Sequence, residues 1–261
     1  MPKDIPTIPN LKQELSENNT KDLVYSEGGI NTYIVKNNNK VDLTGKRIKG
    51  VTIFVKGDAT LIYDKTEGGN KIVLGKGAKV QYNGTGSMIA KDDIIYVTEA
   101  SARLKAENNI VIEGKLYANW RGTGKSGQEL RTGLGNTVAN EKGEQVVPTQ
   151  NITFKNGSAA FIDGSLRAVD LNIEEGASVN ATANVLNATN VTVGGGLKLG
   201  GFLQAGNVTV NGTIDASAEN TAIKVTGKLN MESGSSLTAH YVNVTNNEKD
   251  ENKTVTKVGE A

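Results

Sequence analysis

The sequence predicts an all-β fold: a single-stranded right-handed parallel β-helix, or solenoid, of about ten rungs with a short N-terminal cap segment. Three observations lead to this fold class. A phrase of two short apolar-alternating runs around a polar or glycine-rich corner recurs about every 20 residues, which is typical of solenoids. Glycine accounts for 31 of the 261 residues and proline for only 4. No helical pattern separates the phrases, so βαβ units are excluded.

Residues 1 to 22 are predicted to cap the solenoid or to form a leader ahead of it. Asn10 is a candidate N-cap for the run from Leu11 to Leu15, whose apolar residues at i and i+4 predict a short helix. A cap is expected because an open solenoid end exposes core side chains and unpaired strand groups. A flexible leader is the alternative.

Residues 23 to 245 are predicted to wind into the rungs, with apolar residues inward and Thr, Asn, Lys and Glu outward. A coil that returns after each phrase stacks every strand on its counterpart in the next turn, which gives parallel sheets. Apart from one gap of 42 residues, the phrases start 15 to 23 residues apart, which favours the right-handed form over the strict hexapeptide repeat of left-handed coils. The predicted strand pairs are 33–35 with 41–43, 53–55 with 61–63, 72–74 with 80–82, 95–97 with 102–104, 110–112 with 116–118, 152–154 with 160–162, 171–173 with 179–181, 191–193 with 197–199, 208–210 with 214–216 and 229–231 with 237–239, and 242–244 starts an incomplete phrase.

Two stretches interrupt the repeat. The gap of 42 residues holds either one insertion or one degenerate rung, and we predict a projecting loop over residues 119 to 150. Loops carried on a rigid scaffold are frequent sites of function. Residues 246 to 261 are polar and charged, and they predict a tail or a linker.

The bulk charge excludes some classes of partner. The chain has 29 basic and 28 acidic residues, a net charge of +1, so neither nucleic acid nor an anionic membrane is a predicted partner. Cysteine is absent, which excludes disulfides and thiolate zinc sites. No apolar run is long enough for a transmembrane helix.

The loop at 119 to 150 contains the best candidate for a binding site. Trp120, the only tryptophan, is followed by Arg121, Lys125 and Arg131 and preceded by Tyr117. An indole face stacks on a pyranose ring while nearby polar groups hydrogen-bond its hydroxyls, so these five residues predict a sugar platform. The alternative is that Trp120 folds back over a rung edge. The aromatic residues expected near this surface are Tyr82, Tyr96 and Tyr117.

Motifs of enzymes are incomplete in this chain. Gly-Thr-Gly-Lys-Ser at 122–126 is similar to a phosphate loop, but the glycine required at position 119 is an asparagine. Arg47-Ile48-Lys49 echoes a tripeptide of polygalacturonase-type enzymes, yet the single histidine, His240, stands outside the expected Gly-His-Gly segment and the clustered aspartates are missing. No catalytic residue is therefore predicted.

A metal site is not predicted either. Asp92 and Asp93 are adjacent, and adjacent strand residues point to opposite faces, so they share an ion only if they lie in a loop. No two carboxylates emerge at matching positions of successive rungs, which also argues against a lyase or a glycoside hydrolase. We predict no cofactor and no metal; calcium is conceivable chemically but no pattern supports it.

The phrases at 207–213 (Asn-Val-Thr-Val-Asn-Gly-Thr), 110–116 and 51–57 resemble those of the β-helical surface proteins of gut Bacteroidetes, which are often described as adhesin-like lipoproteins. The resemblance extends over residues 30 to 245. It implies an exported protein tethered to the bacterial cell surface, with an adhesive or structural role. Together with the sugar platform, this leads us to predict a non-enzymatic surface scaffold, adhesin-like or carbohydrate-binding, whose partner is a glycan or another cell-surface ligand. The resemblance implies no catalytic residue, because that group has no shared catalytic motif.

Two alternatives remain open. The first is a polysaccharide lyase or glycoside hydrolase of the pectin-lyase-like β-helix type, which requires carboxylates, or an arginine with carboxylates, in one groove. The second is a self-assembling structural protein similar to bactofilins, whose rungs are shorter and more regular.

Overall fold

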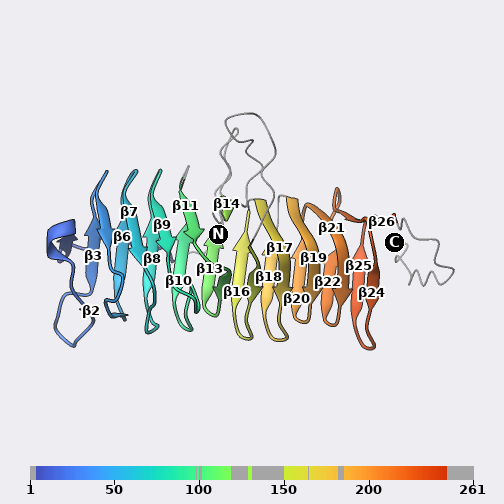
Figure 1. Cartoon of the computed structure of the whole chain (residues 1–261), viewed down its shortest axis with the longest axis horizontal. Helices are drawn as coiled ribbons and strands as arrows, with labels where there is room; N and C mark the ends of the chain where they lie inside the picture. Colours follow the sequence, from blue (N-terminus) through green and yellow to red (C-terminus); the bar gives the residue numbers. More distant parts are fainter. Residues whose placement is uncertain are drawn as a thin grey trace.

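The computed structural model is an all-β parallel solenoid of about ten turns. It describes residues 4–97, 99, 102–118, 129–130, 150–163, 165–181 and 185–245. Figure 1 shows the turns side by side along the long axis, in sequence order from one end to the other. The predicted fold class is thereby confirmed, and the right hand of the coil stays a prediction.

One side of the solenoid is an eleven-stranded parallel sheet, called sheet A below. It takes one strand from each turn, and neighbouring strands pair in register. Its strands in spatial order are β1 (Gln13–Leu15), β3 (Thr32–Val35), β6 (Thr52–Val55), β8 (Lys71–Leu74), β10 (Ile94–Val97), β13 (Lys115–Ala118), β16 (Ala159–Ile162), β18 (Ser178–Ala181), β20 (Gly196–Leu199), β22 (Thr213–Ala216) and β25 (Ser236–Ala239).

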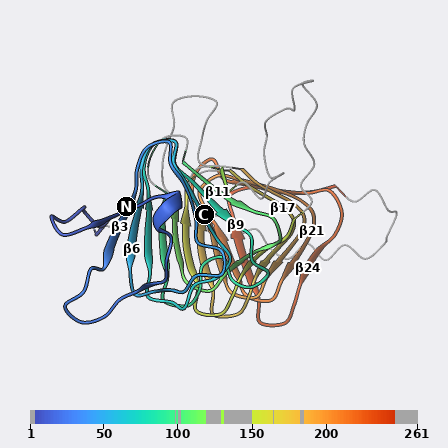
Figure 2. The ribbon, with the colours of Figure 1, turned by 60° about the vertical axis from the view of Figure 1, so that its left-hand side comes forward.

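The remaining sides are formed by a thirteen-stranded parallel sheet, the second sheet, and by one additional strand pair. Figure 2 shows the turns obliquely, wrapped around a common interior. The main path of the second sheet is β4 (Lys40–Asp42), β7 (Thr60–Tyr63), β9 (Lys79–Tyr82), β11 (Arg103–Ala106), β14 (Glu129–Leu130), β17 (Ser165–Ile173), β19 (Val185–Val193), β21 (Phe202–Val210), β23 (Ala222–Val225) and β26 (Val242–Val244). Three further strands belong to this sheet: β12 (Ile110–Ile112) pairs with β15 (Ile152–Phe154), β15 pairs with β17, and β24 (Leu229–Met231) pairs with β21. The additional pair consists of β2 (Leu23–Val24) and β5 (Ile48–Lys49).

The predicted strands form, but their phase around the rung was wrong in the middle of the chain. Counting by phrase aligns Ile95 with Ile110, whereas the structure pairs Ile95 with Leu116 in sheet A. Ile110 instead lies in the second sheet and pairs with Ile152. Strands of the two sheets have the same alternating pattern, so periodicity alone cannot assign a strand to a side.

The N-terminal cap differs from the predicted short helix. Gln13–Leu15 is strand β1, which pairs with Tyr33–Val35 at the edge of sheet A. A 3-10 turn, η1 (Glu17–Asn19), follows it, where the Ser16 amide donates to Asn19 Oδ1 and the Asn19 amide donates to the Ser16 carbonyl. Strand pairing wins over the weak helix signal because β3 otherwise presents an unpaired edge.

The predicted loop at 119–150 lies largely outside the described residues. Two of its residues, Glu129 and Leu130, rejoin the second sheet as β14, between Leu104 of β11 and Leu166 of β17. In contrast, sheet A passes over the insertion directly, because Leu116 of β13 pairs with Ala160 of β16. The residues between β13 and β15 therefore contribute a strand, β14, to the second sheet but no strand to sheet A.

A single apolar core runs the length of the solenoid and consists mainly of Val, Ile, Leu and Ala. At one corner a polar ladder accompanies it: Asn190 Nδ2 donates to Asp170 Oδ1 at 2.8 Å, and Asn207 Nδ2 donates to Asn190 Oδ1 at 2.9 Å. Asn207 Oδ1 in turn accepts from the Lys228 backbone amide. Each bond joins one turn to the next, so this corner is fixed by side chains as well as by the backbone.

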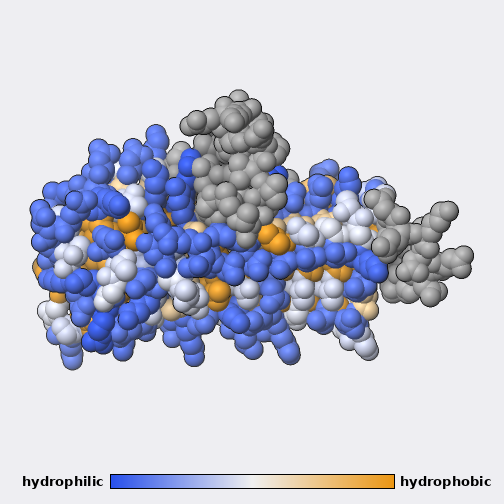
Figure 3. Space-filling model, in the orientation of Figure 1, coloured by the Kyte–Doolittle hydropathy of each residue, from blue (hydrophilic) through white to orange (hydrophobic). Residues whose placement is uncertain are grey.

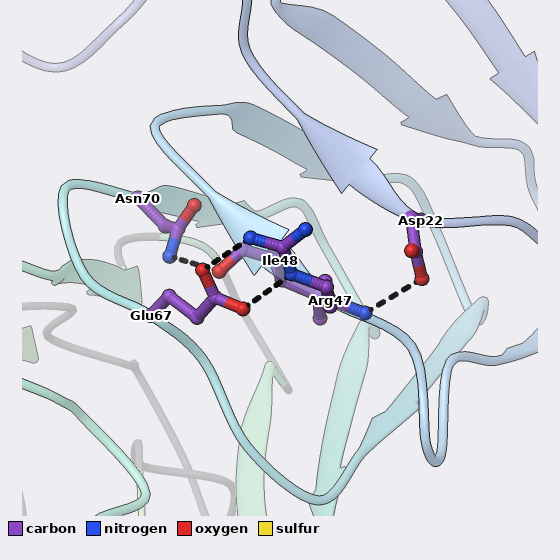
Figure 4. A network of polar contacts seen from close by, with 5 residues as sticks. All are labelled: Asp22, Arg47, Ile48, Glu67 and Asn70. Atoms are coloured by element: carbon purple, nitrogen blue, oxygen red, sulfur yellow. Dashed lines mark hydrogen bonds and ion pairs between the residues drawn. The ribbon is translucent and has the colours of Figure 1, made fainter.

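Figure 4 shows how a second polar network ties the first turns together. The Arg47 guanidinium donates to both oxygens of Glu67, at 2.6 and 3.0 Å, and the Arg47 amide donates to Asp22 Oδ1. Asn70 Nδ2 donates to the Ile48 carbonyl, also drawn in Figure 4. The Arg47-Ile48-Lys49 tripeptide thus has a structural part in three consecutive turns.

Candidate functional site

The outer face of sheet A changes character along the solenoid. One in-register column of outward positions is apolar over six turns and then becomes polar at Asn180, Lys198 and Asp215. We call the apolar part the outer row; its members are Ile34, Phe54, Val73, Tyr96, Tyr117 and Phe161. The first four form a buried cluster separate from the core. Outward apolar residues of this kind mark a surface that something else contacts.

Tyr117 is the one predicted site residue that the structure describes. Its ring stacks on Tyr96, with 5.5 Å between ring centroids and 22° between ring planes. Nearly parallel rings at this distance stack with an offset, and the pair gives the outer face of sheet A an aromatic edge at β10 and β13. Burial raises the pKa of Tyr96, and nearby Tyr117 and Asp4 raise it further.

The other predicted site residues fall elsewhere. Trp120, Arg121, Lys125 and Arg131 lie outside the described residues. Tyr82 points into the core, is fully buried and packs against Tyr63 with 5.4 Å between ring centroids. The expectation that Tyr82 contributes to an outer surface was wrong, because its strand position faces inward.

A groove of about 420 Å³ runs beside the outer row, at the corner where the chain passes from the second sheet into sheet A. Ile94 and Lys115, outward residues at the starts of β10 and β13, line it and stand two positions before Tyr96 and Tyr117. The groove and the aromatic pair therefore form one continuous surface. A second groove of about 410 Å³ continues along the same corner and shares Glu174 with the first.

Charged residues of alternating sign line the groove on three successive turns. Lys155 Nζ lies 2.7 Å from Glu174 Oε1, and Glu174 Oε2 accepts a hydrogen bond from the Asn156 amide at 3.2 Å. Glu113 occupies the corresponding position one turn earlier, since Lys155 N bonds to Ile112 O. The hydrogen bond with Glu174, aided by the charge of Glu113, raises the pKa of Lys155, and the same hydrogen bond lowers the pKa of Glu174.

Asp93 reaches the groove from within the corner. The residue is 4% exposed, and its Oδ1 accepts from both the backbone N and the Nδ2 of Asn70, at 2.8 and 2.9 Å. The Thr66 hydroxyl donates to Oδ2. Burial raises the pKa of Asp93 even though these bonds lower it. A carboxylate held by so many internal donors supports the corner and has little capacity left for a ligand.

The corner backbone also sets the groove's depth. Asp92 takes a positive φ of 67° and stands exposed beside the buried Asp93, so the pair lies in a turn and not in a strand. At Gly114, a Cβ would meet the carbonyl oxygens of Asp93 and Ala90 on the previous turn. Only glycine lets the turns approach this closely.

Sequence reasoning missed this site. The expectation that no two carboxylates stand at matching positions of successive turns is not contradicted, because Lys155 lies between Glu113 and Glu174. It did not anticipate that Asp92, Asp93, Glu113 and Glu174 all line one groove. Their spacing in sequence is uneven, since an insertion separates the turns of Glu113 and Lys155. The sequence did contain a signal: when the turns are aligned, the residue after each inward apolar run is charged, at Glu113, Lys155 and Glu174. Within the described ranges, no group of three or more acidic or histidine residues is arranged to hold a metal ion.

Comparison with models of known protein families, with characterised proteins and with solved structures finds no match. Within the part of the chain that the structure describes, no helix is long and apolar enough to span a membrane. The site's own geometry is therefore the basis for its interpretation. It combines donors and acceptors fixed at successive turns with an aromatic edge, over a length set by the solenoid axis.

Proposed function

We propose that this chain is a non-enzymatic β-helix scaffold that binds an extended carbohydrate along the groove beside sheet A. The observation that carries the proposal is the row Glu113, Lys155 and Glu174, which offers hydrogen-bonding groups on consecutive turns next to Tyr117. A sugar chain presents hydroxyls at regular intervals along an extended backbone. Fixed polar groups spaced along a rigid axis suit such a ligand, and the aromatic edge supplies apolar contact.

Rigidity supports a binding role. The groove is formed by turns whose backbones are hydrogen-bonded to one another, so its polar groups are held in place before the ligand arrives. Preorganised sites bind with a smaller entropic cost than flexible loops. As the resemblance to adhesin-like proteins implies, we place the scaffold at the bacterial cell surface, where an elongated binding module can reach glycans of other cells or of a host.

A polysaccharide lyase or hydrolase is the second candidate, and one observation favours it. Four carboxylates line the groove, and burial raises the pKa of one of them, Asp93, which is typical of a general acid. Against it, Asp93 is engaged by Asn70 and Thr66, and Glu174 is paired with Lys155. Incubation with polygalacturonate and related polymers, with and without calcium, distinguishes the two roles by the appearance of shortened or unsaturated products.

The binding proposal is tested on a glycan array, followed by titration calorimetry with the best ligand. Lys155→Gln is expected to weaken binding at least tenfold, because it removes the groove's central cation. Lys198→Gln is the matched control, since Lys198 also forms an ion pair on the outside of the solenoid, at 3.9 Å from Asp215, but away from the groove. Equal losses in both variants, or no binding by the wild type, would refute the proposal.

Tyr117→Ala and Trp120→Ala test the aromatic part separately. Tyr117→Ala is expected to weaken binding because Tyr117 flanks the groove through Lys115. Trp120→Ala tests the original sugar platform, and unchanged array signals would remove that residue from the site. Tyr241→Ala is the aromatic control, because Tyr241 is 55% exposed near the other end of the solenoid.

A further inference from the structure

Four of the six outer-row residues are buried, on a side of the sheet that ordinarily faces solvent. Ile34, Phe54 and Tyr96 are 4 to 6% exposed, although their strand neighbours on either side face the core. Three half-buried apolar residues pack on this cluster: Ile94 and Tyr117 come from sheet A itself, and Ile5 comes from the N-terminal segment. Ile5 is thus the residue that covers the row from outside the sheet.

The N-terminal segment, residues 4 to 9, reads Asp-Ile-Pro-Thr-Ile-Pro. Ile5 and Pro6 are half-buried, whereas Ile8 is 36% exposed and points away. Asp4 is near enough to Tyr96 to raise its pKa. Since β1 lies four strands away from β10 in sheet A, the segment runs along the axis and crosses several strands.

No strand-like contact holds this segment in place. Among the described residues, no hydrogen bond links residues 4 to 9 to sheet A; the Pro9 carbonyl accepts only from Lys12 Nζ. Proline has no N–H and favours an extended polyproline conformation, so a segment with two prolines docks through apolar contacts. Asn10, Leu11 and Lys12, which join it to β1, are all exposed. The segment can therefore leave the row without breaking a strand pair.

We propose that the outer row is a docking surface for an extended, proline-spaced segment, and that the N-terminal segment of a second copy of this chain can replace the molecule's own. The structure shows the N-terminal segment seated on this surface, with Ile5 packed on the buried cluster. Aromatic and aliphatic rows that bind proline-containing extended peptides are a known mode of recognition. Exchange of an identical element between copies is a low-cost route to association. This interaction goes beyond the proposed carbohydrate binding and does not depend on it.

Docking within one molecule has the advantage of proximity. A short tether gives an effective concentration of about 1 mM, so the molecule's own segment occupies the row in dilute solution. The outer row should bind an N-terminal segment from another molecule detectably only when the chain's own segment can no longer occupy it. Ile5→Asp is expected to disable the chain's own segment, because a carboxylate replaces the described apolar side chain of the segment that packs on the cluster. Ile8→Asp is the matched control: the same substitution three residues away at an exposed position.

The first experiment uses a fluorescent peptide of residues 1 to 12 as the probe and measures anisotropy against full-length chains. We expect the peptide to bind the Ile5→Asp chain saturably and to bind the wild type and the Ile8→Asp chain at least tenfold more weakly. A peptide that itself carries Ile5→Asp should not bind the Ile5→Asp chain. Absence of binding to a folded Ile5→Asp chain, checked by circular dichroism and melting, overturns the proposal. Equal binding to all chains also overturns it, because the peptide would then bind elsewhere.

The second experiment asks for exchange between whole molecules. One chain carries Ile5→Asp and keeps an intact row; the other carries Phe54→Asp, which damages the row and leaves the segment intact. Only the mixture has both a free segment and an open row, so light scattering after gel filtration should show a heterodimer that neither chain forms alone. A mixture that elutes as its separate components refutes the second copy as occupant. Val73→Asp serves in place of Phe54→Asp if that variant does not fold.

Discussion

Removal of the Asp93 carboxylate is expected to destabilise the corner that forms the groove. In Asp93→Ala, two amide groups of Asn70 lose their acceptor. Asn70 is fully buried, and its own side chain also joins Ile48 and Val51. An unsatisfied buried donor costs about 1–3 kcal/mol, so the two together give a loss of about 2–6 kcal/mol in the free energy of unfolding. Thr66 is only half-buried and can turn to water, so its hydroxyl adds little.

Urea denaturation followed by circular dichroism at neutral pH measures this loss as a shift in the midpoint. Asp93→Asn is the comparison, because an amide oxygen still accepts from Asn70 and the hydroxyl of Thr66 can reverse its role from donor to acceptor. We expect Asp93→Asn to cost less than about 1.5 kcal/mol, the ordinary net value of one hydrogen bond. If Asp93→Ala and Asp93→Asn shift the midpoint equally, or if neither does, the corner does not depend on this acceptor.

Three further outcomes are expected. Because burial raises the pKa of Asp93 above 3.8, the wild type should lose stability relative to Asp93→Asn as pH rises through that raised value, and a difference independent of pH contradicts this. For Glu174 the pH dependence runs the other way, because Lys155 lowers its pKa below 4.5. The wild type should be more stable than Glu174→Gln at neutral pH and lose this difference on acidification, and the difference should stay under about 1 kcal/mol because the ion pair is solvent-accessible. Gly212→Ala should lower the melting temperature, because its Cβ would meet the Gly195 carbonyl of the previous turn, whereas Gly196→Ala, with 4.0 Å to its nearest neighbour, should not.

The strands themselves could be predicted from sequence, because inward apolar residues alternate with polar ones in almost every turn. The assignment of strands to sides could not be predicted. Ile95, Ile110 and Leu116 each begin an equally good strand, and only hydrogen-bond register shows that the first and last are neighbours. Because strands on different sides of the solenoid have the same pattern and the corners differ in length, the sequence does not determine to which side each strand belongs.

The outer row could have been predicted from the sequence, but we expected polar residues at all outward positions and so did not predict it. Thr52–Val55, Lys71–Leu74 and Ile94–Val97 each end in three consecutive apolar residues. Such runs are typical of strands covered on both faces. From β18 onward the strands alternate strictly, as Ser178–Ala181 does, and their outer face is polar. The change from continuous to alternating apolar residues thus marks where the outer row ends, between Phe161 of β16 and Asn180 of β18.

The candidate site lies on the apolar side of this change. The side of the molecule drawn in Figure 3 is mostly hydrophilic, with apolar residues in small patches. Tyr117 stands where the N-terminal cover gives way to the open face, and the groove begins two positions away at Lys115. Sheet A pairs β13 with β16 directly, which keeps Lys115 and Tyr117 in register with the next turn irrespective of the residues inserted between them. The two sheets therefore treat the insertion differently: sheet A keeps its register across it, whereas the second sheet takes Glu129 and Leu130 from it as β14.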